Sequence, residues 1–344
     1  MPEAPPYKVC ASAPLRVDLA GGGTDVPRFA AKHGGAAVGA AISLSVHVEV
    51  RLGGSTIRLR SEDRGSRVTV PQPSAITYDG NLDARKAALN MLPVTGGIEM
   101  LTRSDAPPGA GLGERGALNV AVLGALANCR NEAYDAPELA ELAFHLETEE
   151  LRRLSGRQDP YVAALGGVQA LDVGAGRAEA RAVSLALDRV AEGGAHLLVV
   201  YLGRAYAAES AARRVWEAVD GCEADVVEAL AGLRDLVAPM VESWERGDWR
   251  RAAGLFEDAA RHYAVLDPVW SAPPTARLVA AMRDAGAWGV KPAGPRAGAS
   301  LLVLGPADRR REIAGAADAN GGVVLDCAIA TQGVSAWRED LPEA

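Results

Sequence analysis

The alternation of apolar and polar positions in the first hundred residues is typical of β-strands. Tyr7 to Leu19 reads as one strand, and Ser45 to Leu52 alternates valines with polar residues. Shorter strand patterns follow at Thr56 to Arg60 and Arg67 to Val70, and Gly97 to Thr102 leads into a glycine-rich segment. Together with one early helix, these segments predict an antiparallel or mixed sheet.

Helical spacing is more frequent further along the chain. An apolar helix is predicted from Ala117 to Cys129, and the next helix begins with Asp135 as its N-cap and Glu138 three residues later. The stretch Ala175 to Gly194 has no clear pattern, and we place the boundary between two domains there, at 1–185 and 186–344. The second half predicts helices at Ala207–Asp220, Ala224–Arg246 with a kink at Pro239, Asp248–Tyr263 and Thr275–Gly286, and strands at His196–Leu202, Ala299–Leu304 and Gly322–Ala328.

Composition and charge narrow the class of protein. Of 344 residues, 49% are hydrophobic and 23% charged, which are globular values. The net charge of -8 disfavours a nucleic-acid partner but permits a phosphorylated small molecule. No segment predicts a membrane helix or a signal peptide, so we expect a soluble cytoplasmic protein. The four separated cysteines fit a reduced state, although a hidden disulfide stays open.

The glycine-rich segment after Gly97–Thr102 has the build of a phosphate cradle. Gly109, Gly111 and Gly113 allow backbone N–H groups to gather around an anion. The helix that starts near Glu114 points its positive end at the same place. An anion site is therefore expected at this turn.

Two further glycine-containing segments complete a recognisable set. Ala13 to Pro27 is a strand that ends in three glycines, and Trp288 to Ser300 is the third segment. With Gly156 to Tyr161, the chain resembles the GHMP kinases, and most of all their heptose 7-phosphate kinase branch. The resemblance implies an α+β fold of two domains: an N-terminal domain like those of certain ribosomal proteins and translation factors, and a ferredoxin-like C-terminal domain, with the site between them.

The resemblance also implies roles for individual residues. Asp159 matches the catalytic carboxylate, which would take a proton from the acceptor hydroxyl. Arg16 matches the cation that favours the ionised form of Asp159 and offsets charge on the transferring phosphoryl group. Glu147 matches the magnesium ligand, and Asp25 matches the aspartate that binds sugar hydroxyls. The implied substrate-binding segment comprises Gly22, Gly23, Thr24 and Asp25.

Each of these residues also has a plain structural interpretation. Asp159 and Asp25 lie in turn-prone sequence, where aspartate is common. Arg16 could bridge surface carboxylates. Glu147 could belong to a solvated helix face, because other glutamates follow it closely.

The chain departs from the family pattern at two loops. The family's three serines after the glycines are replaced by Glu114, Arg115 and Gly116, and the third loop carries Pro295 and Arg296 in place of glycines. Glu114 could ligate magnesium, and Arg115 could bind phosphate. The residues expected at the nucleotide phosphates are Gly109, Gly111, Leu112, Gly113, Glu114, Arg115, Gly116 and Arg296, and those expected at the metal are Glu147 and Glu114.

Three functions follow from this combination. The first is a kinase that uses ATP and Mg²⁺ on a sugar or sugar phosphate. The second is an enzyme that uses Asp159 and Arg16 for acid–base chemistry on a sugar phosphate without ATP, such as an isomerase or epimerase. The third is a non-catalytic relative of the kinases. Each of these three functions is compatible with a homodimer.

Overall fold

A computed structural model describes residues 7–174, 176–203, 208–294 and 299–341 of the chain. Among these residues, eight strands form the larger sheet, in the order β12-β1-β2-β5-β3-β4, with β6 and β7 continuing from β2. The long strand β2 pairs with β6 through its first part and with β5 through its last. The strands are β1 (Tyr7–Ala20), β2 (Gly35–Leu52), β3 (Ile57–Ser61), β4 (Ser66–Val70), β5 (Ile98–Ser104), β6 (Val168–Val173), β7 (Ala178–Ala182) and β12 (Ser335–Asp340).

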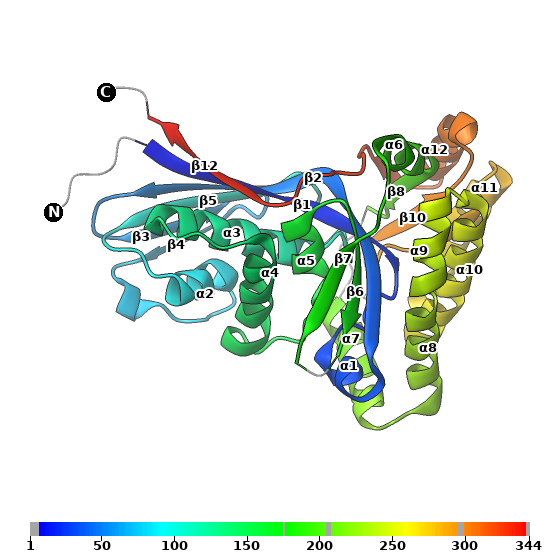
Figure 1. Ribbon diagram of the computed structural model, residues 1–344, viewed down its shortest axis with the longest axis horizontal. Helices are drawn as coiled ribbons and strands as arrows, with labels where there is room; N and C mark the ends of the chain where they lie inside the picture. Colours follow the sequence, from blue (N-terminus) through cyan, green and yellow to red (C-terminus); the bar gives the residue numbers. More distant parts are fainter. Residues whose placement is uncertain (1–6, 175, 204–207, 295–298, 342–344) are drawn as a thin grey trace.

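Helices of the first half lie along one face of this sheet (Figure 1). The buried helix α3 contacts β1 and β2 and packs against α4 and α5. These helices and turns are α1 (Pro27–His33), the 3₁₀ turn Pro73–Ala75, α2 (Asp83–Met91), α3 (Glu114–Arg130), α4 (Ala136–His145), a π-helical turn at Leu146–Glu150, and α5 (Gln158–Leu165).

The smaller sheet has the antiparallel order β11-β8-β10-β9 and a βαββαβ chain order, which is the ferredoxin-like arrangement. Its strands are β8 (Leu197–Tyr201), β9 (Gly289–Pro292), β10 (Ser300–Leu304) and β11 (Val323–Leu325). The helices of this half are α6 (Leu187–His196), α7 (Ala208–Asp220), α8 (Ala224–Asp235), α9 (Val237–Arg246), α10 (Trp249–Leu266), α11 (Pro273–Asp284) and α12 (Arg310–Ala319), with 3₁₀ turns at Pro268–Ser271 and Ala307–Arg309. The predicted α+β class is thereby confirmed.

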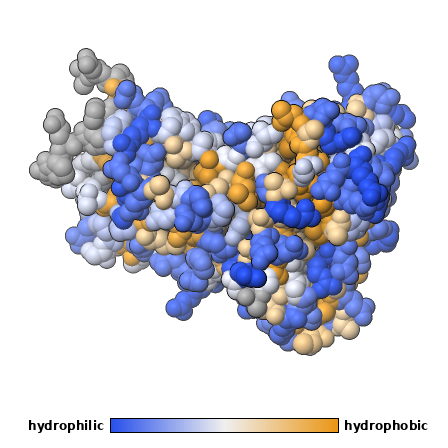
Figure 2. Space-filling view, in the orientation of Figure 1, coloured by the Kyte–Doolittle hydropathy of each residue, from blue (hydrophilic) through white to orange (hydrophobic). Residues whose placement is uncertain are grey.

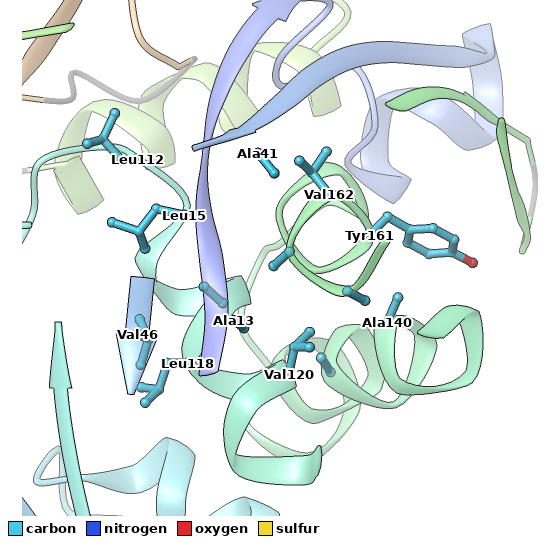
Figure 3. Close-up of a cluster of buried hydrophobic side chains, with 14 of the residues drawn as sticks. Ala13, Leu15, Ala41, Val46, Leu112, Leu118, Val120, Ala140, Tyr161 and Val162 are labelled. Atoms are coloured by element: carbon cyan, nitrogen blue, oxygen red, sulfur yellow. The ribbon is translucent and has the colours of Figure 1, made fainter. Parts of the chain in front are cut away.

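One hydrophobic core extends from the larger sheet to residues of the smaller one, such as Val199 and Leu302. Figure 3 shows part of it, where Leu15 of β1 lies beside Leu112 of the glycine-rich loop. The visible surface is mostly hydrophilic, with apolar residues gathered toward the helices α8–α11 (Figure 2). The last strand, β12, runs antiparallel beside β1, so the end of the chain returns to the first sheet. The division at residue 185 stays a prediction.

Several predicted elements stand where the sequence placed them, and two need correction. Asp135 forms the predicted cap, accepting a hydrogen bond from the Glu138 N–H at 2.8 Å. The helix predicted from Ala224 to Arg246 is instead two helices that part at Leu236, and Pro239 lies in the first turn of α9, where a missing N–H costs little. The stretch predicted to lack pattern contains β7 and α6.

The described part of the chain has no helix long and apolar enough to cross a membrane. The cysteines are free thiols.

Candidate functional site

Arg16 and Asp159, 143 positions apart in the sequence, form an ion pair where the two sheets meet. Arg16 lies on β1, and Asp159 is the second residue of α5. The Asp159 Oδ1 atom accepts from Arg16 Nε at 2.7 Å and lies 2.6 Å from Nη2. The arginine side chain is 6% exposed, whereas that of Asp159 is 28% exposed. The guanidinium is therefore fixed inside, and the carboxylate can still be reached from solvent.

Arg16 also joins the glycine-rich loop to the smaller sheet. Its Nη1 donates to the Gly111 carbonyl at 2.9 Å and to the Ala293 carbonyl, just after β9, at 3.3 Å. Its backbone N–H donates to the Leu112 carbonyl at 2.9 Å. A buried guanidinium needs such acceptors, because each unpaired N–H would carry a desolvation cost. Arg16 thus places the loop and Asp159 in one fixed arrangement.

The loop has the backbone that its glycines predict. Gly109, Gly111 and Gly113 have φ values of 77°, 80° and 73°, which side chains rarely tolerate. The α3 helix follows directly, and no side chain caps its first turn. Its N–H groups and positive end therefore face the loop as an anion site would require. Leu112, expected at the phosphates, buries its side chain in the core, so only its backbone could serve there.

Gly116 brings α3 unusually close to α5. A Cβ atom at this position would lie 2.6 Å from the Asp159 Cβ and 2.7 Å from the Pro160 nitrogen. Real contacts of this kind are about 3.5 Å or longer. Glycine in place of the family's serine at position 116 therefore allows α3 to pack closely against the helix that carries Asp159.

The two carboxylates expected at a metal do not face the same point. Glu114 accepts from Arg64 Nη2 at 2.8 Å and from the Gly109 N–H at 3.4 Å. Glu147, only 3% exposed, accepts from Asn119 Nδ2 at 3.1 Å and lies 3.6 Å from Arg115 Nη1. Arg115 and Asn119 are four residues apart and share a face of α3, which Glu114 does not.

The residues around Glu147 offer a magnesium ion few free ligand atoms. In favour of it, the buried Glu147 Oε2 accepts no hydrogen bond. Against it, the Arg115 guanidinium lies beside that same oxygen. Within the described ranges, no three His, Cys, Asp or Glu side chains gather as a metal set would. The side chains as arranged do not fit a protein-bound magnesium ion, because a guanidinium already stands where its charge would be.

Asp25 is buried against the start of α5. Its Oδ2 accepts from the Gln158 N–H at 2.7 Å, and only a glycine at 156 leaves room, since a Cβ there would lie 2.0 Å from that oxygen. Burial raises the pKa of Asp25 to about 6, and the Asp159 charge adds to the rise while the Gln158 N–H opposes it. Asp25 therefore holds the helix that presents Asp159.

The neighbouring residues of this segment serve the turn itself. The Thr24 hydroxyl oxygen lies 2.8 Å from the Gly21 carbonyl and 2.6 Å from the Ala36 carbonyl, which share its one O–H donor. Gly22 lies against Asp18, where a Cβ would be 2.7 Å from a carboxylate oxygen, and Gly23 has a φ of 94°. Substrate contacts from these residues stay a prediction. Arg296 lies outside the described residues.

Sequence reasoning missed a fully buried ion pair beneath the site. Lys291 Nζ lies 3.0 Å from Asp18 Oδ2, and both side chains are 0% exposed. The same ammonium donates to the carbonyls of Asp18 and Pro292, while Gln158 and Tyr263 donate to the Asp18 carboxylate. Burial alone would raise the pKa of Asp18, but the Lys291 ammonium and Gln158 outweigh it and hold that pKa below its usual range.

A glycine-rich loop and an Arg–Asp pair thus lie at the junction of a larger mixed sheet and a ferredoxin-like one. Residues 82–167 match the family model described as the GHMP kinases N terminal domain. Over this stretch the chain is similar to the GHMP kinases.

Three known proteins are similar to this chain over nearly their whole length. The D-glycero-alpha-D-manno-heptose 7-phosphate kinase of Campylobacter jejuni is 26% identical over 335 residues, which cover 94% of this chain and 97% of the relative. The crystal structure of a protein from Campylobacter jejuni that is assigned as a sugar kinase superposes with a TM-score of 0.79 at 25% identity, over 96% of this chain and 98% of that one. A heptose 1-phosphate kinase from Bacteriodes thetaiotaomicron has the same TM-score at 20% identity, over 96% and 98%, and shows the shared fold.

Proposed function

We propose that the chain is a sugar-phosphate kinase, which transfers the terminal phosphoryl group of ATP to a hydroxyl of its substrate. The observation that carries this proposal is the Arg16–Asp159 pair beside the uncapped start of α3. A proton acceptor and an anion site in contact are what phosphoryl transfer to a hydroxyl needs. The heptose kinases among the relatives support a heptose phosphate as the first substrate to try.

The donor side is the glycine-rich loop. The N–H groups around Gly109, Gly111 and Gly113 and the positive end of α3 would hold the phosphates of ATP. Arg115, 36% exposed in the first turn of α3, would add a charge to the same phosphates. The family's replaced serines therefore leave a loop that can still bind a polyanion.

The acceptor side is built on α5. The Asp159 carboxylate would accept the proton of the substrate hydroxyl as that oxygen bonds to the terminal phosphorus and the bond to the bridging oxygen breaks, which releases ADP. Arg16, fixed by two carbonyls and by Asp159, would hold the carboxylate in place and offset negative charge nearby. Asp25 would set the position of α5 through the Gln158 N–H.

The relatives also bear on the alternatives to a kinase. The three similar proteins described above are all named as kinases. This supports phosphoryl transfer over ATP-independent acid–base chemistry or a non-catalytic role.

ADP formation with a panel of sugar phosphates tests the proposal. D-glycero-D-manno-heptose 7-phosphate and its 1-phosphate belong in the panel, with unphosphorylated sugars for comparison. ATP alone is expected to raise the melting temperature, since a ligand that binds only the folded state stabilises it. If ATP gives no thermal shift and no member of the panel gives ADP, the kinase proposal is contradicted.

A further inference from the structure

Glu147 is a buried carboxylate between two guanidinium groups. It lies in the π-helical turn Leu146–Glu150, where its side chain is 3% exposed. Arg115 Nη1 lies 3.6 Å from Oε2, and Arg153 Nη1 lies 3.6 Å from Oε1. Asn119 donates to Oε1 at 3.1 Å. The carboxylate is thus neutralised by this chain's own cations.

Arg115 stands on the side of α3 that faces Glu147 and at the end that faces the loop. It is the second residue of the helix, directly after Glu114, so it belongs to the first turn, the end of the helix where an anion would bind. Its side chain is 36% exposed, so part of it is open to solvent and can meet a ligand. One guanidinium can pair with a carboxylate on one edge and with a phosphate on another, because it carries five N–H donors.

A divalent cation would compete for the same space. Magnesium binds carboxylate oxygens at about 2.0–2.1 Å. An ion on Glu147 Oε2 would therefore lie within about 6 Å of the Arg115 charge, given the 3.6 Å between that oxygen and Nη1. Like charges this close in a buried site repel, so the Arg115 guanidinium disfavours a cation on this oxygen.

We propose that Arg115 takes the place of a protein-bound divalent cation: Glu147 anchors its guanidinium, and the guanidinium neutralises the triphosphate at the start of α3. This inference rests on the proposed kinase function for the identity of the anion. Glu147 is then a positioning residue for Arg115 and not a metal ligand. Where the family has a serine, Arg115 then supplies a positive charge of its own.

The proposal gives a clear expectation for nucleotide binding. A triphosphate should bind this loop nearly as well in a chelator as in magnesium. Removing the guanidinium should uncover the carboxylate and make binding depend on the metal.

Calorimetric titration with the non-hydrolysable analogue AMP-PNP, in EDTA and in Mg²⁺, tests this directly. The wild-type Kd should differ by less than about threefold between the two buffers, whereas Arg115→Ser should bind at least about tenfold tighter with Mg²⁺. The double variant Arg115→Ser/Glu147→Gln should lose that dependence, and Arg115→Lys should behave like wild type. Circular dichroism of each variant checks that it is folded.

The outcomes separate this proposal from the kinase proposal. Wild-type binding that needs Mg²⁺ by about tenfold or more, and loses the need in Glu147→Gln, would make Glu147 a metal ligand and overturn the role of Arg115 while leaving the kinase standing. No binding of AMP-PNP by folded wild-type protein in either buffer would contradict both.

Discussion

Adding one methyl group at Gly116 should displace the Asp159 carboxylate, the proposed proton acceptor. The new Cβ would lie 2.6 Å from the Asp159 Cβ and 2.7 Å from both the Asp159 carbonyl carbon and the Pro160 nitrogen. To reach ordinary contact distances, α3 and α5 must move apart by about 1 Å. Overpacking of this kind costs about 1–3 kcal/mol, of which the better helix propensity of alanine offsets about 0.5–1 kcal/mol. Gly116→Ala should therefore lose up to about 2.5 kcal/mol of stability.

Gly124→Ala is the matched control, since it adds the same methyl group to the same buried helix. A Cβ at Gly124 would meet only the tips of Val334 and Leu139, at 3.5 and 3.8 Å, so this variant should be neutral or more stable by up to about 1 kcal/mol.

Urea unfolding followed by tryptophan fluorescence measures the stability of both variants, and the rate of sugar-phosphate phosphorylation measures the position of Asp159. A shift of about 1 Å at the reacting group should slow Gly116→Ala by about a hundredfold and leave Gly124→Ala unaffected. Equal stability and equal rates for the two variants would refute the close packing of α3 on Asp159.

Two further predictions concern buried charges. The pKa of Asp25 is raised from 3.8 to about 6, so the folded state holds a proton that the unfolded chain has lost. Protonated Asp25 should therefore contribute about 3 kcal/mol to the free energy of unfolding below pH 4, and this contribution should be lost as the pH rises through 6. A free energy of unfolding that does not change with pH in wild type, or that falls equally in Asp25→Asn, would count against the raised pKa. Lys291→Met should cost about 3–5 kcal/mol in urea unfolding because it leaves the Asp18 carboxylate buried without its cation. The double variant Asp18→Asn/Lys291→Met should recover part of that loss, and no recovery would show that the lysine acts through packing alone.

Local patterns predicted the elements that carry the site. The strand Tyr7–Leu19, the glycine turn and the helix after it each have their own signature in the sequence, and each stands within a few residues of its predicted place. The strand and the helix within Ala175–Gly194 could not be predicted from local patterns. Its strand β7 is largely exposed, and α6 contains two glycines near its end, which disfavour a helix.

The partners of the charged residues were not predictable from local sequence. Asp18 and Lys291 both sit in apolar strands, where a charge is costly unless it is paired, and their partnership spans 273 positions. A lone charge inside each buried strand pattern was the available signal. Likewise, nothing near Glu114 indicates that Arg64 will neutralise it, because the two meet only when the turn after β3 folds toward the loop.

Phosphorus NMR of a reaction of the purified protein with ATP and a sugar phosphate tests the central claim most directly. Wild type should give ADP together with a new phosphomonoester on the sugar phosphate. Asp159→Asn should slow that transfer by about 10²–10⁴-fold, whereas Asp172→Asn, on the exposed side of β6, should not change it. Transfer at the wild-type rate in Asp159→Asn would contradict the account of this site.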